Sequence, residues 1–255
     1  MKIPFRNKGD LNILKEDDLM IKIAHRGLSM YYPENTLIAY KKAYEKGIIN
    51  VECDISFTKD NVPVLLHDNQ INRTSNKKGK TNKYTIEELK KLDFGSWFDI
   101  KFKDEKIPTL KEFLELCKEL SLIPYIEIKP IKNKKLIKKY CKIIIDIVND
   151  IDYHNIVFIS FSLDILKEIN FYYQYRLGLI TKKLKKNLLN KFIKIRNNTS
   201  NLFIYHYNKK IDDKIINLCK DNNIELEVWT IENKNDLLNI NPYISRVTCN
   251  YIEEE

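Results

Sequence analysis

Short apolar runs alternate along this chain with longer stretches in which apolar residues recur every three or four positions. The short runs are typical of buried β-strands, and the longer repeats are typical of amphipathic helices. Runs that fit strands lie at residues 20–24, 50–56, 62–66, 122–128, 156–160, 175–180, 201–205, 224–229 and 244–248. Helical spacing is found between most of them, at residues 34–46, 110–120, 133–149, 183–196 and 209–221.

The repeated order of strand and then helix predicts a parallel sheet. About eight such units in one chain of 255 residues favour a (β/α)₈ barrel of the TIM type. An open, doubly wound sheet is the alternative, but no glycine-rich phosphate loop follows the first strand. We therefore expect residues 1–255 to form one barrel domain.

A polar interval at residues 69–108 interrupts the alternation and contains no strong strand pattern. Thr85 and Glu88 have the spacing of a capping box, which predicts the start of a short helix. Thr109 and Glu112 repeat that spacing at the start of the helix 110–120. We interpret residues 69–108 as an insertion that emerges from one face of the barrel, and long insertions of this kind tend to carry function.

Composition and charge exclude several classes of protein. The chain is 44% hydrophobic and 31% charged, which is typical of a globular protein and not of a disordered one. Its net charge of +9 comes from scattered lysines without interleaved aromatic residues, so we expect no nucleic-acid partner. The lysine-rich segment 182–196 is interpreted as a barrel helix with a solvent-exposed face, and attraction to a membrane surface is the second interpretation.

The cysteines and the N-terminus indicate the compartment. The chain has five cysteines, widely spaced and without a CxxC pair, so neither a zinc ribbon nor a disulfide framework is indicated. The N-terminal residues contain no continuous apolar segment, and no stretch approaches the length of a membrane span. We therefore expect a cytoplasmic location.

The strand pattern 50-NVECDISF-57 raises the first question of chemistry. Glu52 and Asp54 alternate with apolar residues and hence lie on one face of the strand. That face is either a polar outer surface or part of a closed interior. In an interior, two unpaired carboxylates would require a cation.

Polar residues follow two other apolar runs directly. His25 and Arg26 come after the first run, and His67 and Asp68 come after the run 62–66. In a parallel barrel the active site forms at the carboxyl ends of the strands, so we expect these residues at the barrel mouth. A histidine there offers an acid or base, and an arginine offers an anion-binding fork.

Glu127 and Lys129 lie on one face at the end of the strand 122–128. Together with Glu52 and Asp54, Glu127 would supply three hard oxygen ligands, which suit Mg²⁺, Ca²⁺ or Mn²⁺ rather than Zn²⁺. The positive charge of Lys129 suits a phosphate ligand. Two histidines beside a divalent cation and a phosphate would suit acid–base cleavage of a phosphodiester.

These residues lie in motifs that resemble the glycerophosphodiester phosphodiesterase family. The similarity runs through IAHRGLSMYYPENTLIAYKKAYEKG at 23–47, then VECDISFTKDNVPVLLHD, LDFGSWF, EIK at 127–129 and VWTIEN at 228–233. It covers nearly the whole chain, and the combination HRG…PENT…ExDxxxTxDxxxVxxHD is specific. The resemblance implies a TIM-type barrel with an insertion after the HD strand, which matches residues 69–108.

The resemblance also implies roles for eight residues. The general acid/base pair would be His25 and His67. One divalent cation, Mg²⁺ or Ca²⁺, would be held by Glu52, Asp54 and Glu127. Arg26 and Lys129 would bind the phosphate, and Trp229 at the top of the seventh strand would lie near the glycerol or the leaving group.

In the mechanism that the resemblance implies, the glycerol 2-hydroxyl attacks phosphorus, one histidine takes its proton and the other protonates the leaving alcohol. Water then opens the cyclic intermediate to give glycerol 3-phosphate. The residues alone do not assign the acid and the base. The alternatives are a relative that cleaves lysophospholipids and an inactive barrel that binds phosphodiesters, the latter disfavoured because no expected residue is missing.

Two further features leave alternatives open. Glu34 and Asn35 of PENT either cap the first helix or contact the substrate. The chain ends at 248-TCNYIEEE-255, where family members continue into a final helix, so the last helix is expected to be truncated. We expect residues 10–19 to cover part of the eighth strand in its place.

Overall fold

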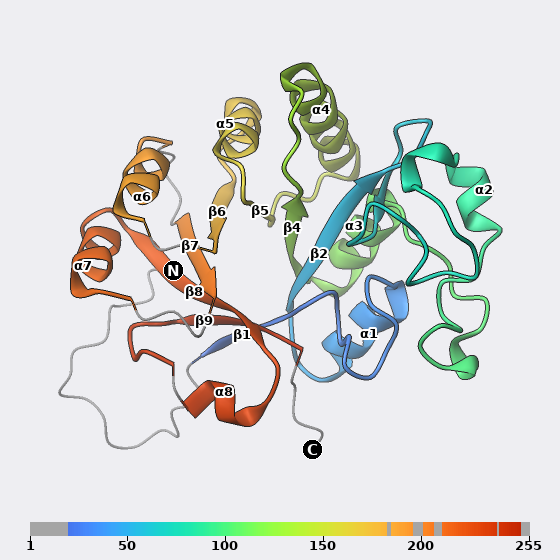
Figure 1. Ribbon diagram of the computed structural model, residues 1–255, viewed down its shortest axis with the longest axis horizontal. Coiled ribbons are helices and arrows are strands. Elements are labelled where there is room, and N and C mark those ends of the chain that lie inside the picture. Colours follow the sequence, from blue (N-terminus) through green and yellow to red (C-terminus); the bar gives the residue numbers. More distant parts are fainter. Residues whose placement is uncertain (1–19, 183–184, 196–200, 207–210, 239, 251–255) are drawn as a thin grey trace.

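The computed structural model describes residues 20–182, 185–195, 201–206, 211–238 and 240–250. Its sheet has nine strands, of which all but β3 are parallel and form a closed ring (Figure 1). The strands of the ring are β1 (Ile21–Ala24), β2 (Asn50–Phe57), β4 (Ile123–Ile128), β5 (Val157–Ser160), β6 (Arg176–Thr181), β7 (Asn201–His206), β8 (Ile224–Ile231) and β9 (Arg246–Cys249). β1 closes the ring because it pairs with β9 on one side and with β2 on the other. The predicted barrel is therefore confirmed.

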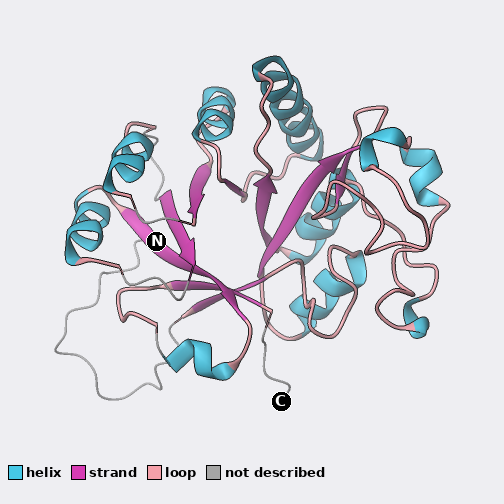
Figure 2. Cartoon of the chain, in the orientation of Figure 1, coloured by secondary structure: helices cyan, strands magenta, loops and turns pink. Residues whose placement is uncertain are grey.

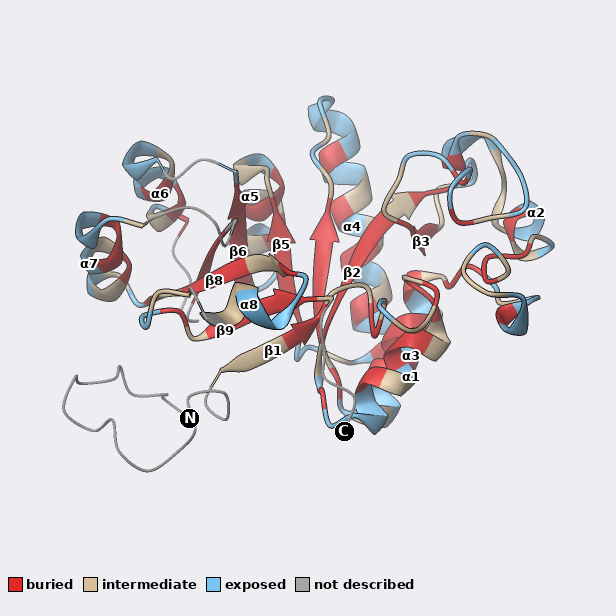
Figure 3. Cartoon of the chain, turned by 60° about the horizontal axis from the view of Figure 1, so that its bottom comes forward, coloured by how far each residue is buried: buried red, intermediate tan, exposed pale blue. Residues whose placement is uncertain are grey.

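Helices cover the outside of the barrel (Figure 2). They are α1 (Leu37–Glu45), α3 (Leu110–Leu120), α4 (Lys134–Ile151), α5 (Leu163–Tyr172), α6 (Lys186–Ile193), α7 (Asp213–Asp221) and the short α8 (Lys234–Leu238). Alternate strand residues such as Cys53 and Phe158 pack outward against apolar helix faces that include Leu114 and Ile144. The strands between these layers are buried along most of their length (Figure 3).

The other strand faces fill the barrel interior. Ile23, Tyr125, Ile159, Ile180 and Ile204 form a separate apolar cluster there, contributed by five different strands. Branched side chains of this kind are typical of the packed layers inside such barrels. These side chains fill the barrel interior below its mouth.

β3 (Pro63–Leu65) corrects one expectation. We expected the run 62–66 to resemble the other strands, but β3 lies outside the ring and runs antiparallel to β2. Only residues 58–62 separate the two strands. A parallel crossover needs about a dozen residues or more, so a connection this short permits only a hairpin.

The insertion has a small core of its own. Ile71, Leu89, Phe94 and Ile107 pack against Val64 and Leu66 of the β3 segment. Its helix α2 (Ile86–Lys90) begins at Thr85 with the predicted capping box to Glu88, and α3 begins at Thr109 with the same motif to Glu112. Short 3₁₀ turns at Thr81–Lys83 and Ile100–Phe102 complete the insertion.

Two other expectations concern helix boundaries. The first helix starts at Leu37 and is capped by Thr36, whose hydroxyl accepts from the Ala39 backbone N–H. Glu34 and Asn35 therefore precede the cap and are free to contact other groups. In the lysine-rich segment, α6 buries Leu189 and Phe192 as a barrel helix does, while residues 183, 184 and 196 are not described.

The predicted covering segment 10–19 lies outside the described residues, as does the end of the chain at 251–255. Among the helices that the structure describes, none combines the length and the apolar character needed to cross a bilayer.

Candidate active site

The turn after β1 brings His25 and Arg26 over the barrel mouth. Gly27 has φ +81°, and a Cβ at this position would lie 2.7 Å from the Ala39 Cβ, so the loop needs glycine to pack on α1. Arg26 also has a left-handed backbone, with φ 58°. Its N–H donates to Glu52 Oε2 at 3.0 Å, which compensates for an uncommon conformation at a non-glycine residue.

Glu52 and Asp54 lie on the inner face of β2, and Glu127 on the neighbouring strand β4 pairs in register with Asp54. One oxygen of each carboxylate lies within 4.8 Å of the others. The three residues are 2%, 0% and 7% exposed, in the order Glu52, Asp54, Glu127. The charged interior, and not the polar outer surface, is therefore the correct interpretation of the NVECDISF pattern.

The three carboxylates share two cationic partners. Lys129 Nζ lies 2.6 Å from Asp54 Oδ1 and 2.9 Å from Glu127 Oε1, and Arg26 Nε lies 3.1 Å from Asp54 Oδ2. Burial opposes the ionisation of Asp54, but Lys129 and Arg26 outweigh it and lower the pKa of this carboxyl. Burial, and then the charges of Asp54 and Glu127, raise the pKa of Glu52 well above its usual value. The three carboxylates are therefore a candidate site for a metal ion.

Asn35, a buried residue of the loop between β1 and α1, contacts the acidic cluster. Its Nδ2 donates to Asp54 Oδ2 at 3.1 Å, and its Oδ1 accepts from Tyr40 Oη at 2.9 Å. The alternatives for PENT, a helix cap or direct substrate contact, did not include this role. The sequence feature that could have indicated this role is the position of Asn35 directly before the helix cap, in the PENT motif.

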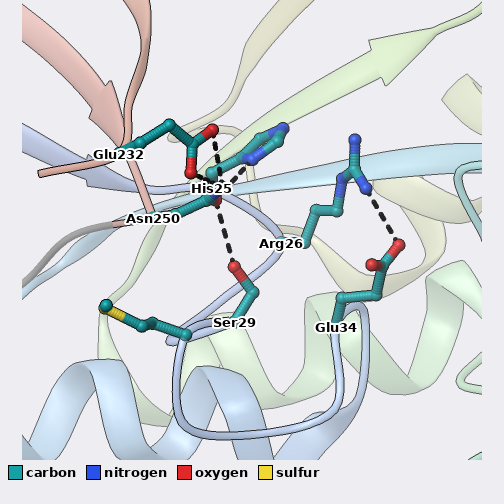
Figure 4. Close-up of a pocket in the computed structure, with 7 residues that line it drawn as sticks. His25, Arg26, Ser29, Glu34, Glu232 and Asn250 are labelled. Carbon is teal, nitrogen blue, oxygen red and sulfur yellow. Dashed lines mark hydrogen bonds and ion pairs between the residues drawn. The ribbon is translucent and has the colours of Figure 1, made fainter. Parts of the chain in front are cut away.

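His25 is oriented by Asn250, which was not among the residues predicted from the sequence. The His25 Nδ1 lies 2.7 Å from Asn250 Oδ1, while Asn250 Nδ2 donates to the Glu232 carboxylate (Figure 4). Since a carboxylate only accepts, the amide orientation is fixed and His25 Nδ1–H is the donor. Ser29 Oγ also donates to Asn250 Oδ1, at 3.2 Å. The sequence feature that could have indicated Asn250 is the T-x-N pattern at residues 248–250.

The other ring nitrogen of His25 is directed toward the acidic cluster, with Nε2 3.9 Å from Glu52 Oε2. Burial and the charge of Arg26 lower the pKa of His25 to about 4. The ring is therefore neutral at pH 7, and its Nε2 carries a lone pair.

His67 also lies at the barrel mouth, but it follows a different kind of strand from the one expected. It does not stand at the carboxyl end of a barrel strand: β3 turns back along β2, and the Leu66 N–H bonds the Asp54 carbonyl at 2.9 Å. The His67 Nδ1 lies 2.7 Å from Asp68 Oδ1. The second oxygen of Asp68 accepts from Arg73 Nε at 2.8 Å.

A cavity of about 1000 Å³ joins these groups to the opposite side of the barrel mouth. Its lining includes both histidines, Arg26, Glu52, Glu127 and Lys129. Across from them the lining includes a group of apolar side chains, Ile159, Ile180, Ile204, Phe161 and Trp229, together with Lys182 and Glu227. Phe161 and Trp229 meet edge to face with ring centroids 5.9 Å apart. Trp229 therefore lines the same cavity as the other predicted residues, except Asp54, which is not part of the lining.

Glu227 is an acidic residue of this cavity that no sequence motif indicated. It is fully buried, accepts from Thr248 Oγ1 at 2.8 Å, and its Oε2 has no hydrogen-bond partner among the described residues. Burial raises the pKa of Glu227 to about 7.

We expect this carboxyl to make stability depend on pH. A pKa raised in the folded state means that the stability present at low pH is lost as pH rises from about 4.5 to 7. Glu227→Gln cannot lose a proton, so above pH 7 the variant should be more stable than the wild type by up to about 3 kcal/mol. Chemical denaturation at a series of pH values measures the difference, and an offset that does not change with pH would contradict the expectation.

The fold and the buried acidic cluster beside two histidines define an α/β-barrel enzyme suited to phosphodiesters. Residues 25–246 match the model of the glycerophosphoryl diester phosphodiesterase family. The chain belongs to this family and is a glycerophosphodiester phosphodiesterase, a phosphoric diester hydrolase.

Individual relatives agree with this assignment. A glycerophosphodiester phosphodiesterase of Caldanaerobacter subterraneus subsp. tengcongensis is 33% identical over 229 residues, which cover 84% of this chain and 87% of that protein. Glycerophosphodiester phosphodiesterase 1 of Mus musculus is 41% identical over 128 residues, or 49% of this chain and 39% of the mouse protein. A phosphodiesterase of Oleispira antarctica, solved in complex with the product sn-glycerol-3-phosphate, is 25% identical and has a TM-score of 0.82 over 92% of this chain and 94% of that one.

Proposed function

We propose that this enzyme hydrolyses glycerophosphodiesters to glycerol 3-phosphate and an alcohol, with one divalent cation and with His25 and His67 as base and acid. The observation that carries the proposal is the arrangement of three buried carboxylates within 4.8 Å of one another beside His25. A buried carboxylate group of this kind is costly unless a cation compensates it. The product bound to the Oleispira relative is of the chemical class proposed here.

The donor set fits a hard cation. Glu52, Asp54 and Glu127 offer only carboxylate oxygens, which favours Mg²⁺ or Ca²⁺, with Mn²⁺ as a further candidate. When bound, such an ion supplies a Lewis acid that polarises the phosphoryl oxygen. Arg26 and Lys129, both in the cavity lining, would bind the other phosphate oxygens and offset the charge that develops on them.

The partners of the two histidines support different roles. His25 donates from Nδ1 to a neutral amide and is itself neutral, so its Nε2 is suited to take the proton of the attacking glycerol hydroxyl. His67 donates from Nδ1 to the Asp68 carboxylate, which orients the ring and leaves Nε2 as the nitrogen that can deliver a proton to the leaving alcohol. Water then opens the cyclic intermediate with the two roles exchanged.

Cleavage of lysophospholipids is the second candidate. The observation that favours it is the apolar wall of Ile159, Phe161, Ile180 and Ile204, which offers a surface for an acyl chain.

The free, buried state of all five cysteines suits a reducing compartment, in line with the predicted cytoplasmic location.

The proposal is tested by assaying glycerophosphocholine and lysophosphatidylcholine with and without EDTA. We expect choline release from glycerophosphocholine by the untreated enzyme, and no release of choline or of glycerol 3-phosphate after chelation. Mg²⁺, Ca²⁺ and Mn²⁺ are then added back separately to identify the ion. Activity that survives complete chelation would overturn the metal dependence, and cleavage of lysophosphatidylcholine alone would favour the second candidate.

A further inference from the structure

One arginine of the insertion bridges two carboxylates at the rim of the active site. Arg73 donates from Nη1 and Nη2 to the two oxygens of Glu34, at 2.7 and 2.8 Å. Its Nε donates to Asp68 Oδ2 at 2.8 Å. The three contacts use the planar fork of the guanidinium, which matches carboxylates in a way that the single ammonium of lysine cannot.

Each of the two carboxylates also binds a group of the proposed mechanism. The second oxygen of Asp68 accepts from His67 Nδ1 at 2.7 Å. Glu34 accepts from Arg26 Nη1 at 3.0 Å (Figure 4). A continuous chain of hydrogen bonds therefore leads from His67 through Asp68, Arg73 and Glu34 to Arg26.

The charges along this chain alternate and support one another. Partial burial opposes the ionisation of Asp68 and Glu34, but hydrogen bonds that include those from Arg73 lower the pKa of both carboxyls. The Arg73 side chain is 43% exposed, and its guanidinium carbon lies 5.8 Å from the centre of the Trp97 ring in the same insertion. An ion pair this exposed adds little to global stability, so we infer the role of Arg73 from the geometry of its contacts.

We propose that Arg73 is a positioning residue, through which the insertion holds the Asp68 carboxylate against His67 Nδ1. With Asp68 fixed, His67 carries its proton on Nδ1 when neutral and presents Nε2 to the cavity. Without Arg73, the half-exposed Asp68 can rotate into solvent, and both tautomers of His67 become accessible. Arg26 depends less on Arg73, because Asp54 holds its Nε independently at 3.1 Å. The inference rests on the proposed function for its kinetic consequence but not for its structural one.

The test compares Arg73→Met, Arg73→Lys and Arg73→Ala with Lys90→Met. Lys90 belongs to the same insertion and forms an ion pair with Glu112 at 2.6 Å, away from the cavity, so Lys90→Met is a matched control for the loss of a surface ion pair. For Arg73→Met we expect kcat on glycerophosphocholine to fall about 10- to 100-fold with less than about a threefold change in KM. Arg73→Lys should recover part of the loss, and millimolar guanidinium should raise the rate of Arg73→Ala but not that of the wild type.

A second measurement does not depend on activity. In ¹⁵N-histidine NMR spectra of the whole protein, with His67 assigned from the His67→Gln variant, the wild type should show the Nδ1–H tautomer. Arg73→Met should show a mixture of tautomers, and Lys90→Met should match the wild type. An unchanged His67 spectrum in Arg73→Met, or a loss of kcat no larger than that of Lys90→Met, would overturn the inference. If the wild type fails to cleave glycerophosphodiesters while the tautomer shifts as described, the proposed function fails and the positioning role stands.

Discussion

Replacing His67 with glutamine is expected to lower kcat/KM on glycerophosphocholine by about 10²- to 10⁴-fold, the usual contribution of a positioned acid or base. The leaving alcohol would then depart as an alkoxide, because no other described residue of the cavity stands in the same relation to an orienting carboxylate. In a single turnover, His67→Gln should release nitrophenolate from a glycerophosphodiester of 4-nitrophenol nearly as fast as the wild type does, since nitrophenolate leaves without a proton and His67 is needed only for the later opening of the cyclic intermediate.

The matched variant His25→Gln separates the two roles. If His25 is the base, this variant should lose activity on both substrates, because the attacking hydroxyl must give up its proton in either case. Glutamine can still bond Asn250, so the loop should keep its shape. Recovery on the nitrophenyl substrate by His25→Gln in place of His67→Gln would reverse the assignment, and recovery by neither would contradict the separate roles.

Glu52→Gln is expected to produce the second large effect. Relative to the wild type, the variant should be more stable without metal and less stable with metal. Without metal, the variant should be more stable than the wild type, because burial and the charges of Asp54 and Glu127 disfavour the ionised Glu52. The amide oxygen can still accept the Arg26 N–H, so the local backbone is retained. Activity should fall about 10³-fold, since a ligand worth several kcal/mol of charge stabilisation is lost.

Thermal unfolding, with and without metal, measures both stability differences. The melting temperature of the wild type should rise by roughly 5–10 °C when the metal is present at about 100 times its dissociation constant, and that of Glu52→Gln should not rise. Lys90→Met should respond to the metal as the wild type does. A metal-induced shift that persists in Glu52→Gln would remove Glu52 from the proposed ligand set. A metal-free variant less stable than the wild type would contradict the account of repulsion among the three carboxylates.

The strand-and-helix periodicity was sufficient to predict the barrel, because every strand in the ring is covered by helices on one side and packed side chains on the other. The Thr-x-x-Glu spacing predicted both capping boxes, since this motif is local in the chain. The hairpin of β3 was missed because a short apolar run has the same pattern in a parallel and in an antiparallel pair. What distinguishes them is the length of the connection, residues 58–62, which allows no crossover.

Within the site, the sequence by itself indicated the residues proposed to carry the chemistry: the residues after the apolar runs and the carboxylates on inner strand faces. The contacts of Asn250 with His25, of Asn35 with Asp54 and of Arg73 with Glu34 and Asp68 were decided only by the tertiary structure. These contacts join residues far apart in the chain, up to 225 positions in the case of His25 and Asn250. Periodicity reports which face of an element is buried, whereas the orientation of a histidine depends on which hydrogen-bond partner the closed barrel brings to its second nitrogen.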